Sequence, residues 1–512
     1  MSLISLQFAA FVVISVIVYY LIPKKYQWVW LLIISYIYYV SSGIKIAFFL
    51  LFSTFVTYFT GTMLENTNET CQDKALAGKK KRRIVILGLL LDFGMLGVLK
   101  YTNFVLQIFH AFSGGKTPGF SFLLPLGISF YTFQSAGYIL DVYWGKCKAE
   151  KQPFKFALFV SFFPQLLQGP IGRFGRLAPQ LFEEHTLSCR RVEYALQRIL
   201  WGFFKKMVLA DNAAMFVNAI FNHQERYDGV AIVGVLMYSI QLYGDFSGGI
   251  DVVSGVAALF GVGLDENFKR PYFAKSITDF WHRWHITLGT WMKDYVFYPV
   301  SLSKWMGKFT KRAKKVFGKK TGRTLPICLA NLIVFLVVGI WHGAAWKFIV
   351  YGLYNGVIIA VSGLLANSYR QWKKKLHINE KSKLWISFQI LRTFILVNIS
   401  WFFDRADDIP QALHMMKNAV THFQISQLWL PGTLPLGDGS PKFTTLILLT
   451  LAAGCVILLV HSLMEEHGID VGHRLMERPA VLRFAVYTVL FFMLPGIGAL
   501  PASMGGFIYA QF

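Results

Sequence analysis

Long apolar runs separated by short polar segments dominate the chain, and their length is that of membrane-spanning helices. The first four runs lie at about residues 5–22, 26–41, 46–63 and 84–112. Roughly 20 predominantly apolar residues cross the hydrocarbon core of a bilayer as a helix, so these runs predict membrane helices. The first run lacks a basic preceding region and a small-residue cleavage site, so we expect it to be retained and not removed as a signal peptide.

Further apolar runs predict further crossings, and two segments are less regular. The runs lie at about residues 119–143, 192–222, 229–263, 384–403, 442–463 and 482–500, and at 325–369, which is long enough to cross twice. Residues 156–180 are interrupted by FPQLLQGP, which predicts a broken or re-entrant element whose backbone must be buried by protein. Residues 276–300 are aromatic and amphipathic, so they lie either in the interface or within the bundle.

The composition supports the same fold class and excludes a soluble protein. Of the 512 residues, 55% are hydrophobic and only 15% are charged, whereas soluble domains carry about 25% charged residues. We therefore expect an all-α polytopic membrane protein, a bundle of about 11 to 13 membrane helices including re-entrant elements. No segment has the composition of a soluble domain, so residues 1–512 form a single integral membrane domain.

The net charge of +24 is concentrated in short blocks between the apolar runs. The blocks lie at residues 79–83, 304–323 and 370–375. Such blocks are typical of cytoplasmic loops, and no basic face of the kind that binds nucleic acid is evident. Counting crossings from these loops predicts a polar external loop at residues 404–441 and places both termini outside the cytoplasm. The five cysteines are scattered without CxxC spacing, so we interpret them as unpaired.

His342 lies in VVGIWHGAAW (residues 337–346), near the middle of the predicted path out and back. An ionisable side chain inside a membrane is expensive, and such residues usually have a function. A buried imidazole either hydrogen-bonds a backbone carbonyl or, kept neutral, takes a proton from a hydroxyl. Gly339 and Gly343 favour a place where backbones or a substrate approach closely.

Two further histidines lie in the aromatic segment at residues 278–299. If this segment is one helix, its apolar residues form a stripe, and His282 and His285 lie on roughly one face. The stripe consists of Trp281, Trp284, Leu288 and Trp291. An HxxH spacing can bind a metal, but no carboxylate or cysteine cluster completes such a site, so we predict none. Acid–base catalysis and helix packing are the alternatives for each histidine.

Two other segments carry charges among apolar residues. In QLYGDFSGGIDVVSG (residues 241–255), Asp245 and Asp251 are either functional or paired with Lys or Arg in a packed helix. In QGPIGRFGRL (residues 168–177), Arg173 and Arg176 either hold a phosphate or another anion, or serve as interfacial anchors.

Together these motifs resemble the membrane-bound O-acyltransferase family, and within it the bacterial alginate O-acetylation branch with its peptidoglycan and teichoic-acid relatives. The resemblance lies in the order of six segments: residues 124–143, 162–174, 242–252, 279–299, 339–348 and 401–406. It extends from about residue 98 to the end. It implies a core at about residues 98–410, followed by C-terminal helices and an external tail at residues 411–512.

The resemblance also implies a site. His285 and His342 match the two signature histidines, whereas His282 is left to helix packing. The family fold has a central tunnel, which a cytoplasmic acyl thioester such as acetyl-CoA enters from one side and an acceptor from the other. His342 would be the general base, and His285 would orient or stabilise the developing oxyanion. Other expected tunnel or substrate residues are Trp284, Trp341, Gly343, Asp245 and Arg173, and no bound cofactor is expected.

The external tail GGFIYAQF (residues 505–512) has two interpretations. Its aromatic residues are suited to anchoring at the outer membrane interface. The tail also resembles a C-terminal aromatic motif in the family, where a tyrosine near the terminus receives the acyl group. Under that interpretation Tyr509 is a covalent acyl carrier, and His342 is the base that its phenol needs. An external acetyl-transferring partner protein would then complete the reaction.

The leading expectation is therefore O-acylation, most simply O-acetylation, of a cell-surface polysaccharide by a bacterial plasma-membrane enzyme. D-alanyl transfer to teichoic acid is the first alternative, although those proteins resemble shorter chains that use a separate carrier peptide. A transporter or flippase is the second, although the chain shows no inverted repeat. Acylation of lipids or proteins remains a third.

Overall fold

The computed structural model confirms an all-α polytopic membrane protein. It describes residues 1–114, 119–120, 122, 125, 127–166, 168–430, 432 and 441–497, with side chains to residue 492. Within these residues no β-strand forms, and an isolated β-bridge joins Phe268 to Trp284. Seven of the described helices are long and apolar enough to cross a membrane: α3, α4, α11 with the turn before it, α15, α16, α18 and α20.

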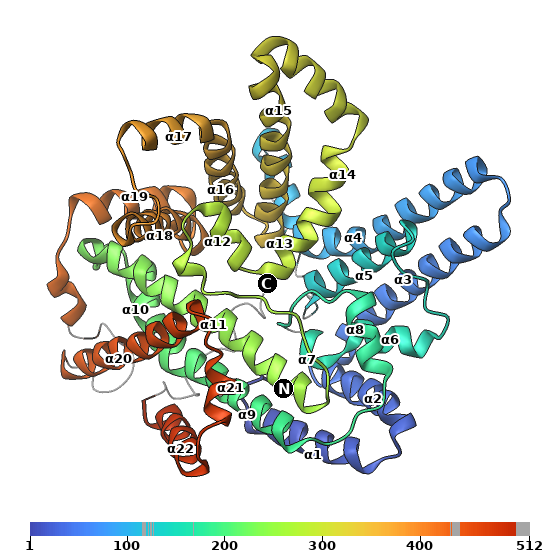
Figure 1. Ribbon diagram of the computed structural model, residues 1–512, viewed down its shortest axis with the longest axis horizontal. Helices are drawn as coiled ribbons and strands as arrows, with labels where there is room; N and C mark the ends of the chain where they lie inside the picture. The colour runs from blue at the N-terminus through green and yellow to red at the C-terminus, as the bar shows by residue number, and fades with distance from the viewer. Residues whose placement is uncertain are drawn as a thin grey trace.

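The N-terminal helices follow the predicted apolar runs closely (Figure 1). They are α1 (Leu6–Leu21), η1 (Lys24–Tyr26), α2 (Gln27–Val40), α3 (Ile44–Thr70), α4 (Lys74–Ser113) and α5 (Ile128–Tyr143). The α3–α4 hairpin reaches away from the rest of the bundle on the right of Figure 1. Within the predicted crossing at residues 119–143, α5 begins at Ile128, directly after the left-handed Gly127.

The middle of the chain is divided into shorter pieces. They are α6 (Pro153–Ser161), α7 (Phe163–Leu166), α8 (Phe174–Phe182), α9 (Cys189–Phe203), η2 (Phe204–Ala210), α10 (Asp211–Asn222), η3 (Asp228–Val230), α11 (Ala231–Leu259), η4 (Pro271–Phe273), α12 (Ile277–Arg283), α13 (Ile286–Met292), η5 (Lys293–Phe297) and α14 (Tyr298–Ser301). Most residues of α11 are buried, and this helix contacts α9, α10, η2, α18 and α19. It is therefore the central support of the bundle.

The C-terminal part returns to longer helices. They are α15 (Lys304–His342), α16 (Trp346–Leu364), α17 (Ala366–Lys375), α18 (Lys383–Arg405), α19 (Ile409–Thr421), η6 (Ile425–Trp429), α20 (Pro441–Glu466), α21 (Val471–Met476) and α22 (Ala480–Ile497). In Figure 1 the last three lie together at the lower left, beside α9 and α11.

Two predicted loops are partly helical. The basic block at residues 79–83 belongs to α4, which begins at Lys74 because the Asp73 carboxylate accepts hydrogen bonds from the Ala75 and Leu76 amides. Lys and Arg are good helix formers, so the helix continues beyond its apolar part. The predicted external loop at 404–441 contains α19, whose Ala412 and Met415 are buried. Its apolar face gains enough burial to fold against α11.

The predicted interruption between residues 156 and 180 is confirmed, and side-chain amides support its backbone. Gln134 donates to the Phe159 carbonyl at 2.6 Å, and Gln165 donates to the Gln134 amide oxygen at 2.9 Å. The Thr287 hydroxyl accepts from the Ile171 amide at 3.1 Å. Irregular backbone in a membrane protein is stable only where protein replaces the missing water, and these contacts meet that requirement.

A buried ion cluster joins α10, η2 and α11. The Lys206 ammonium lies 2.7 Å from a carboxylate oxygen of Asp245 and 2.7 Å from one of Asp211. All three side chains are almost fully excluded from the surface. The π-helical turn of η2 breaks the regular helical spacing at this point, as π-turns often do at special sites. Lys206 is therefore the cation that two buried carboxylates share.

We predict that Lys206→Met will lower the apparent unfolding temperature of the detergent-solubilised protein. The change keeps the length of the side chain but removes the shared cation, and breaking a buried ion pair costs about 3–5 kcal/mol. The exposed Lys311 on α15 is the matched control, and Lys311→Met should unfold like wild type. A Lys206→Met protein that unfolds at the wild-type temperature would show that the cluster does not stabilise the bundle.

Candidate functional site

His342 lies at the turn of a helical hairpin. It is the last residue of α15, and α16 begins four residues later. Two groups of α4 satisfy the carbonyls at this helix end: Lys100 donates to the Trp341 carbonyl at 2.7 Å, and Tyr101 donates to the Ile340 carbonyl at 2.7 Å. The helix C-terminus is thus capped by protein, which buries the imidazole without leaving those carbonyls unsatisfied.

The hairpin can turn so tightly because glycines face each other across it. A Cβ atom on Gly339 would collide with the Phe348 carbonyl, and one on Gly352 would collide with the Phe335 carbonyl. At the turn itself, a Cβ atom on Gly343 would strike the ring of Phe348. The expectation that glycine marks a close approach beside His342 is confirmed, and the approach is one of backbone and Phe348.

A carboxylate and a phenol lie next to His342. Nδ1 of His342 is 4.0 Å from a carboxylate oxygen of Asp404, at the end of α18. The other carboxylate oxygen accepts a hydrogen bond from the Tyr238 hydroxyl at 2.6 Å. Lys347 donates to the Asp404 carbonyl at 3.2 Å, which fixes the backbone of the same residue. The ring of Tyr351 stands across the imidazole, with ring centres 5.0 Å apart.

His285 lies where the predicted long helix breaks. The residue adopts a left-handed conformation (φ 48°, ψ 53°) between α12 and α13, which costs an L-residue about 1–2 kcal/mol. Asn267 holds the break: its carbonyl accepts from the Ile286 amide at 3.0 Å, and its side-chain oxygen accepts from the Thr287 amide at 3.0 Å. The expected single helical face is therefore wrong. His282 is exposed and His285 is buried, so the two do not share a face.

The contacts of Asn267 favour one tautomer of His285. A backbone N–H can only donate, so the side-chain atom of Asn267 that faces the Thr287 amide must be the oxygen. Nδ1 of His285 lies 3.2 Å from that same oxygen, and it donates there in the tautomer that carries the hydrogen on Nδ1. In the neutral imidazole the other ring nitrogen, Nε2, is then a hydrogen-bond acceptor. This tautomer limits what His285 can do in a reaction.

Trp341 joins the two histidines. Its ring centre lies 5.7 Å from that of His285 and 5.1 Å from that of His342. The indole is buried and stacks on Phe133, and its N–H has no hydrogen-bond acceptor within the described part of the chain. Two imidazoles and one N–H donor thus meet in an apolar interior, an arrangement suited to proton transfer next to a developing negative charge.

The other predicted site residues lie at different distances from this centre. Trp284 is fully buried. Among the described residues its ring contacts aromatic side chains such as Phe280 and Trp401, so it forms the wall behind His285. Asp245 belongs to the Lys206 cluster, which confirms the paired alternative. Arg173 pairs with Asp294 at 2.9 Å and lies over the Tyr295 ring, so any anionic ligand would have to share it with that carboxylate.

Several residues that hold the histidines could not be predicted from the sequence. Asn267 lies in a turn without a motif, and Lys100 comes from α4, more than 200 residues before His342. Asp404 belongs to WFFDRA, and its position among aromatic residues was the available signal. The described residues contain no group of three or more His, Cys, Asp or Glu side chains that could hold a metal ion. Tyr509 lies outside the described residues.

Comparison with known proteins identifies similar sequences. The model of the membrane-bound O-acyltransferase family matches residues 151–313, which lie within the expected core. A probable alginate O-acetylase of Azotobacter vinelandii is 32% identical over 88% of this chain and 82% of its own length. A peptidoglycan O-acetyltransferase of Helicobacter pylori is 33% identical over 78% of this chain and 74% of its own. A teichoic acid D-alanyltransferase of Bacillus subtilis is 31% identical, but over only 49% of this chain.

Proposed function

Because the chain belongs to the membrane-bound O-acyltransferase family, we propose that it transfers an acyl group, most simply acetyl, from a cytoplasmic thioester to a cell-surface polysaccharide. The protein is a multi-pass membrane O-acyltransferase. The alginate and peptidoglycan relatives, which match most of the chain, favour a polysaccharide acceptor and an acetyl group. The D-alanyl relative matches half of the chain, so D-alanyl transfer is the weaker alternative, and nothing favours a transporter.

The observation that carries this proposal is the meeting of His342, His285 and Trp341 in the buried interior. Nδ1 of His342 faces Asp404, and Nε2 is the atom that takes the proton of an acceptor hydroxyl. The hydroxyl oxygen then attacks the thioester carbonyl and forms a tetrahedral oxyanion. When this collapses, the C–S bond breaks, the thiolate leaves, and the proton on His342 passes to it.

Of the two expected roles of His285, we propose the orienting one. With Nδ1 protonated toward Asn267, neutral His285 offers Nε2 as an acceptor, which can orient the hydroxyl but cannot donate to an oxyanion. The indole ring of Trp341 lies beside both imidazoles, and its N–H is our candidate for that task. Exclusion of water by the surrounding aromatic rings would protect the acyl group from hydrolysis.

We further propose a path for the acyl group across the membrane. A central tunnel would admit a donor such as acetyl-CoA from the cytoplasm, without a bound cofactor. The acyl group would pass first to the Tyr509 hydroxyl as an ester and then, through an external acetyl-transferring protein, to the polysaccharide. The basic blocks support a bacterial plasma membrane orientation with both termini outside the cytoplasm. The single domain would comprise the core at about 98–410 and the C-terminal part at 411–512.

We predict that His342→Ala will reduce thioester consumption and polysaccharide O-acylation by about 10²- to 10⁴-fold, the usual contribution of a general base. Mass analysis of the surface polysaccharide and assay of thiol release by the purified protein give two measurements. His282→Ala is the matched control, because this exposed histidine lies outside the centre. Acylation that continues unchanged in His342→Ala would overturn the mechanism.

We predict that Asp404→Asn will lower kcat at least about tenfold and leave KM nearly unchanged. The amide keeps an acceptor for Tyr238 but loses the charge that orients and stabilises the imidazolium of His342. Asp407 is exposed in the same turn, so Asp407→Asn should behave like wild type. If Asp404→Asn lowered the unfolding temperature and kcat fell only in proportion to the loss of folded protein, Asp404 would be only structural.

We predict an acyl adduct on Tyr509 after incubation of the wild-type protein with a donor thioester. Intact-mass and peptide analysis should find the adduct in wild type, and neither Tyr509→Phe nor His342→Ala should form it. Tyr509→Phe should still unfold like wild type, because it lacks only a hydroxyl. An undiminished adduct in Tyr509→Phe, or none in wild type, would favour the aromatic-anchor interpretation.

A further inference from the structure

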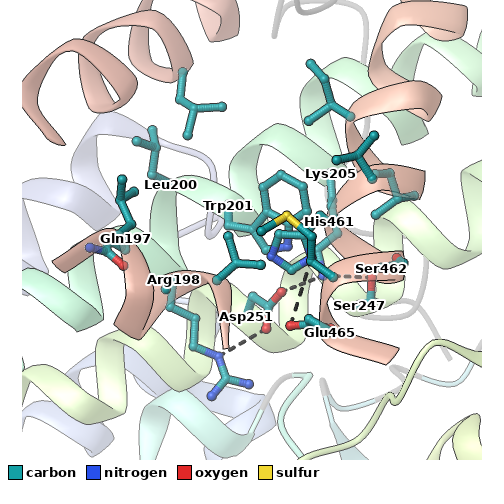
Figure 2. A pocket seen from close by; sticks show the side chains of 18 of the residues that line it. Gln197, Arg198, Leu200, Trp201, Lys205, Ser247, Asp251, His461, Ser462 and Glu465 are labelled. Carbon is teal, nitrogen blue, oxygen red and sulfur yellow. Dashed lines mark hydrogen bonds and ion pairs between the residues drawn. The ribbon is translucent and has the colours of Figure 1, made fainter. Parts of the chain in front are cut away.

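A cavity lies away from the histidine centre, between α9, α11, the segment at residues 266–270 and the C-terminal helices (Figure 2). Its volume is about 860 Å³, within the roughly 300–1,000 Å³ that ligand pockets usually have. The stacked rings of Trp201 and His461, 4.3 Å apart, project into it from α9 and from α20. None of the residues assigned to the acyl transfer above lines this cavity.

The cavity changes from apolar to charged along its length. The apolar lining comes mainly from α9, α20 and α22 and includes Leu200, Val456, Ile457, Val460, Val489 and Leu490. On α20 the apolar residues come first, and Glu465 follows near the end of the helix. Since an α-helix rises 1.5 Å per residue, Val456 and Glu465 are separated by about 14 Å along its axis.

The wall formed by α22 is mostly apolar. Its polar lining residue is Tyr487, which bonds to Glu193 of α9, and Ala485 and Val486 precede it. Val489 and Leu490 follow further along. The charged residues of these walls, Glu465 and Asp470, lie where α20 ends and α21 begins. A ligand that fits must have a polar head and an apolar tail.

The charged end of the cavity contains four cationic and four anionic side chains. Its cations are Arg198, Lys205, Lys269 and Arg270, and its anions are Asp251, Glu266, Glu465 and Asp470. Most of them already bind one another: Asp251 pairs with Lys205 and Arg198, and Arg270 pairs with Glu465. Lys269 forms no ion pair with any described residue, and the Asp470 side chain is 57% exposed. This end therefore offers an ammonium to a phosphate and a carboxylate to an amine.

From this gradient and this charge pattern we propose that the cavity binds one zwitterionic glycerophospholipid, of the phosphatidylethanolamine type. Its phosphate lies at Lys269, its ammonium donates to the carboxylates of Asp470 and Glu465, and an acyl chain follows the apolar residues of α20 and α22. A purely anionic lipid would meet as many carboxylates as cations at this end. The membrane that surrounds the protein supplies this ligand at high local concentration.

The bound lipid would also touch the support of His285. The cavity wall includes Phe268 and Lys269, which directly follow Asn267. Phe268 forms the backbone bridge to Trp284, and the Lys269 amide donates to the Arg283 carbonyl at 2.9 Å. Occupancy of the cavity thus steadies the segment that keeps His285 in its left-handed conformation. Lipid binding itself is independent of acyl transfer and can be measured without a donor.

The test uses the full-length protein, purified in detergent and delipidated, with native mass spectrometry as the measurement. Phosphatidylethanolamine, phosphatidylglycerol with the same acyl chains, and soluble glycerophosphoethanolamine are titrated separately. We expect one phosphatidylethanolamine to bind tightest and the soluble head group not to bind at the same concentrations. Preference for phosphatidylglycerol would overturn the head-group assignment, and equally tight binding of the soluble head group would overturn the assignment of the tail.

Two pairs of variants locate the site. Val460→Trp fills the cavity and should reduce binding at least about fivefold, whereas Leu459→Trp, a neighbouring and equally exposed residue outside the lining, should not. Lys269→Glu should weaken binding about tenfold, the value of one charge-assisted hydrogen bond. The exposed Lys308, which is not in the lining, provides Lys308→Glu as its control. Equal effects within either pair, or no lipid bound by wild type, would contradict the proposal.

Discussion

The constraint on which this structure depends is that a polar group inside the bundle must find its partner in the protein. Water is not available at membrane depth, and an unsatisfied polar group there costs several kcal/mol. Asp92, which is fully buried, accepts from the Ser53 and Thr57 hydroxyls at 2.8 and 2.9 Å. The Lys206 ammonium forms ion pairs with two carboxylates. Each of these contacts joins different helices, so the rule that satisfies polar groups also fixes how the helices pack.

The same rule explains why the chemistry lies at helix ends and breaks. A regular helix uses its own backbone bonds and presents side chains only outward, whereas an end or a break exposes carbonyls and amides that other segments must bind. At the end of α15, Lys100 and Tyr101 bind those carbonyls; at the break after α12, Asn267 binds the amides. The partners that allow the irregular backbone therefore also determine where His342 and His285 stand.

The sequence predicted the elements that depend on local pattern. Apolar runs located α1, α2, α11 and α18 within a few residues, and FPQLLQGP correctly marked a break. The hydrophobic pattern predicted a single helical face at residues 276–300, and this was wrong. Asn267 stabilises a left-handed turn at His285, and hydrophobic periodicity does not reveal such a contact. The pattern also missed Asp404 as the neighbour of His342, since 62 residues and two intervening helices separate them in the chain. Motif resemblance supplied both histidines, but not the residues that orient them.

The two histidines rest on different kinds of support, and this difference suits their proposed tasks. His342 ends a hairpin whose glycines bring two backbones into contact, so its position is set by close packing and leaves little freedom. His285 depends on a few hydrogen bonds from one segment, residues 266–270. The other side of this segment lines the cavity shown in Figure 2. A base must meet its proton at short range, which the rigid hairpin provides. A residue that orients an incoming hydroxyl can tolerate adjustment, and the segment that carries it is the one in contact with whatever fills that cavity.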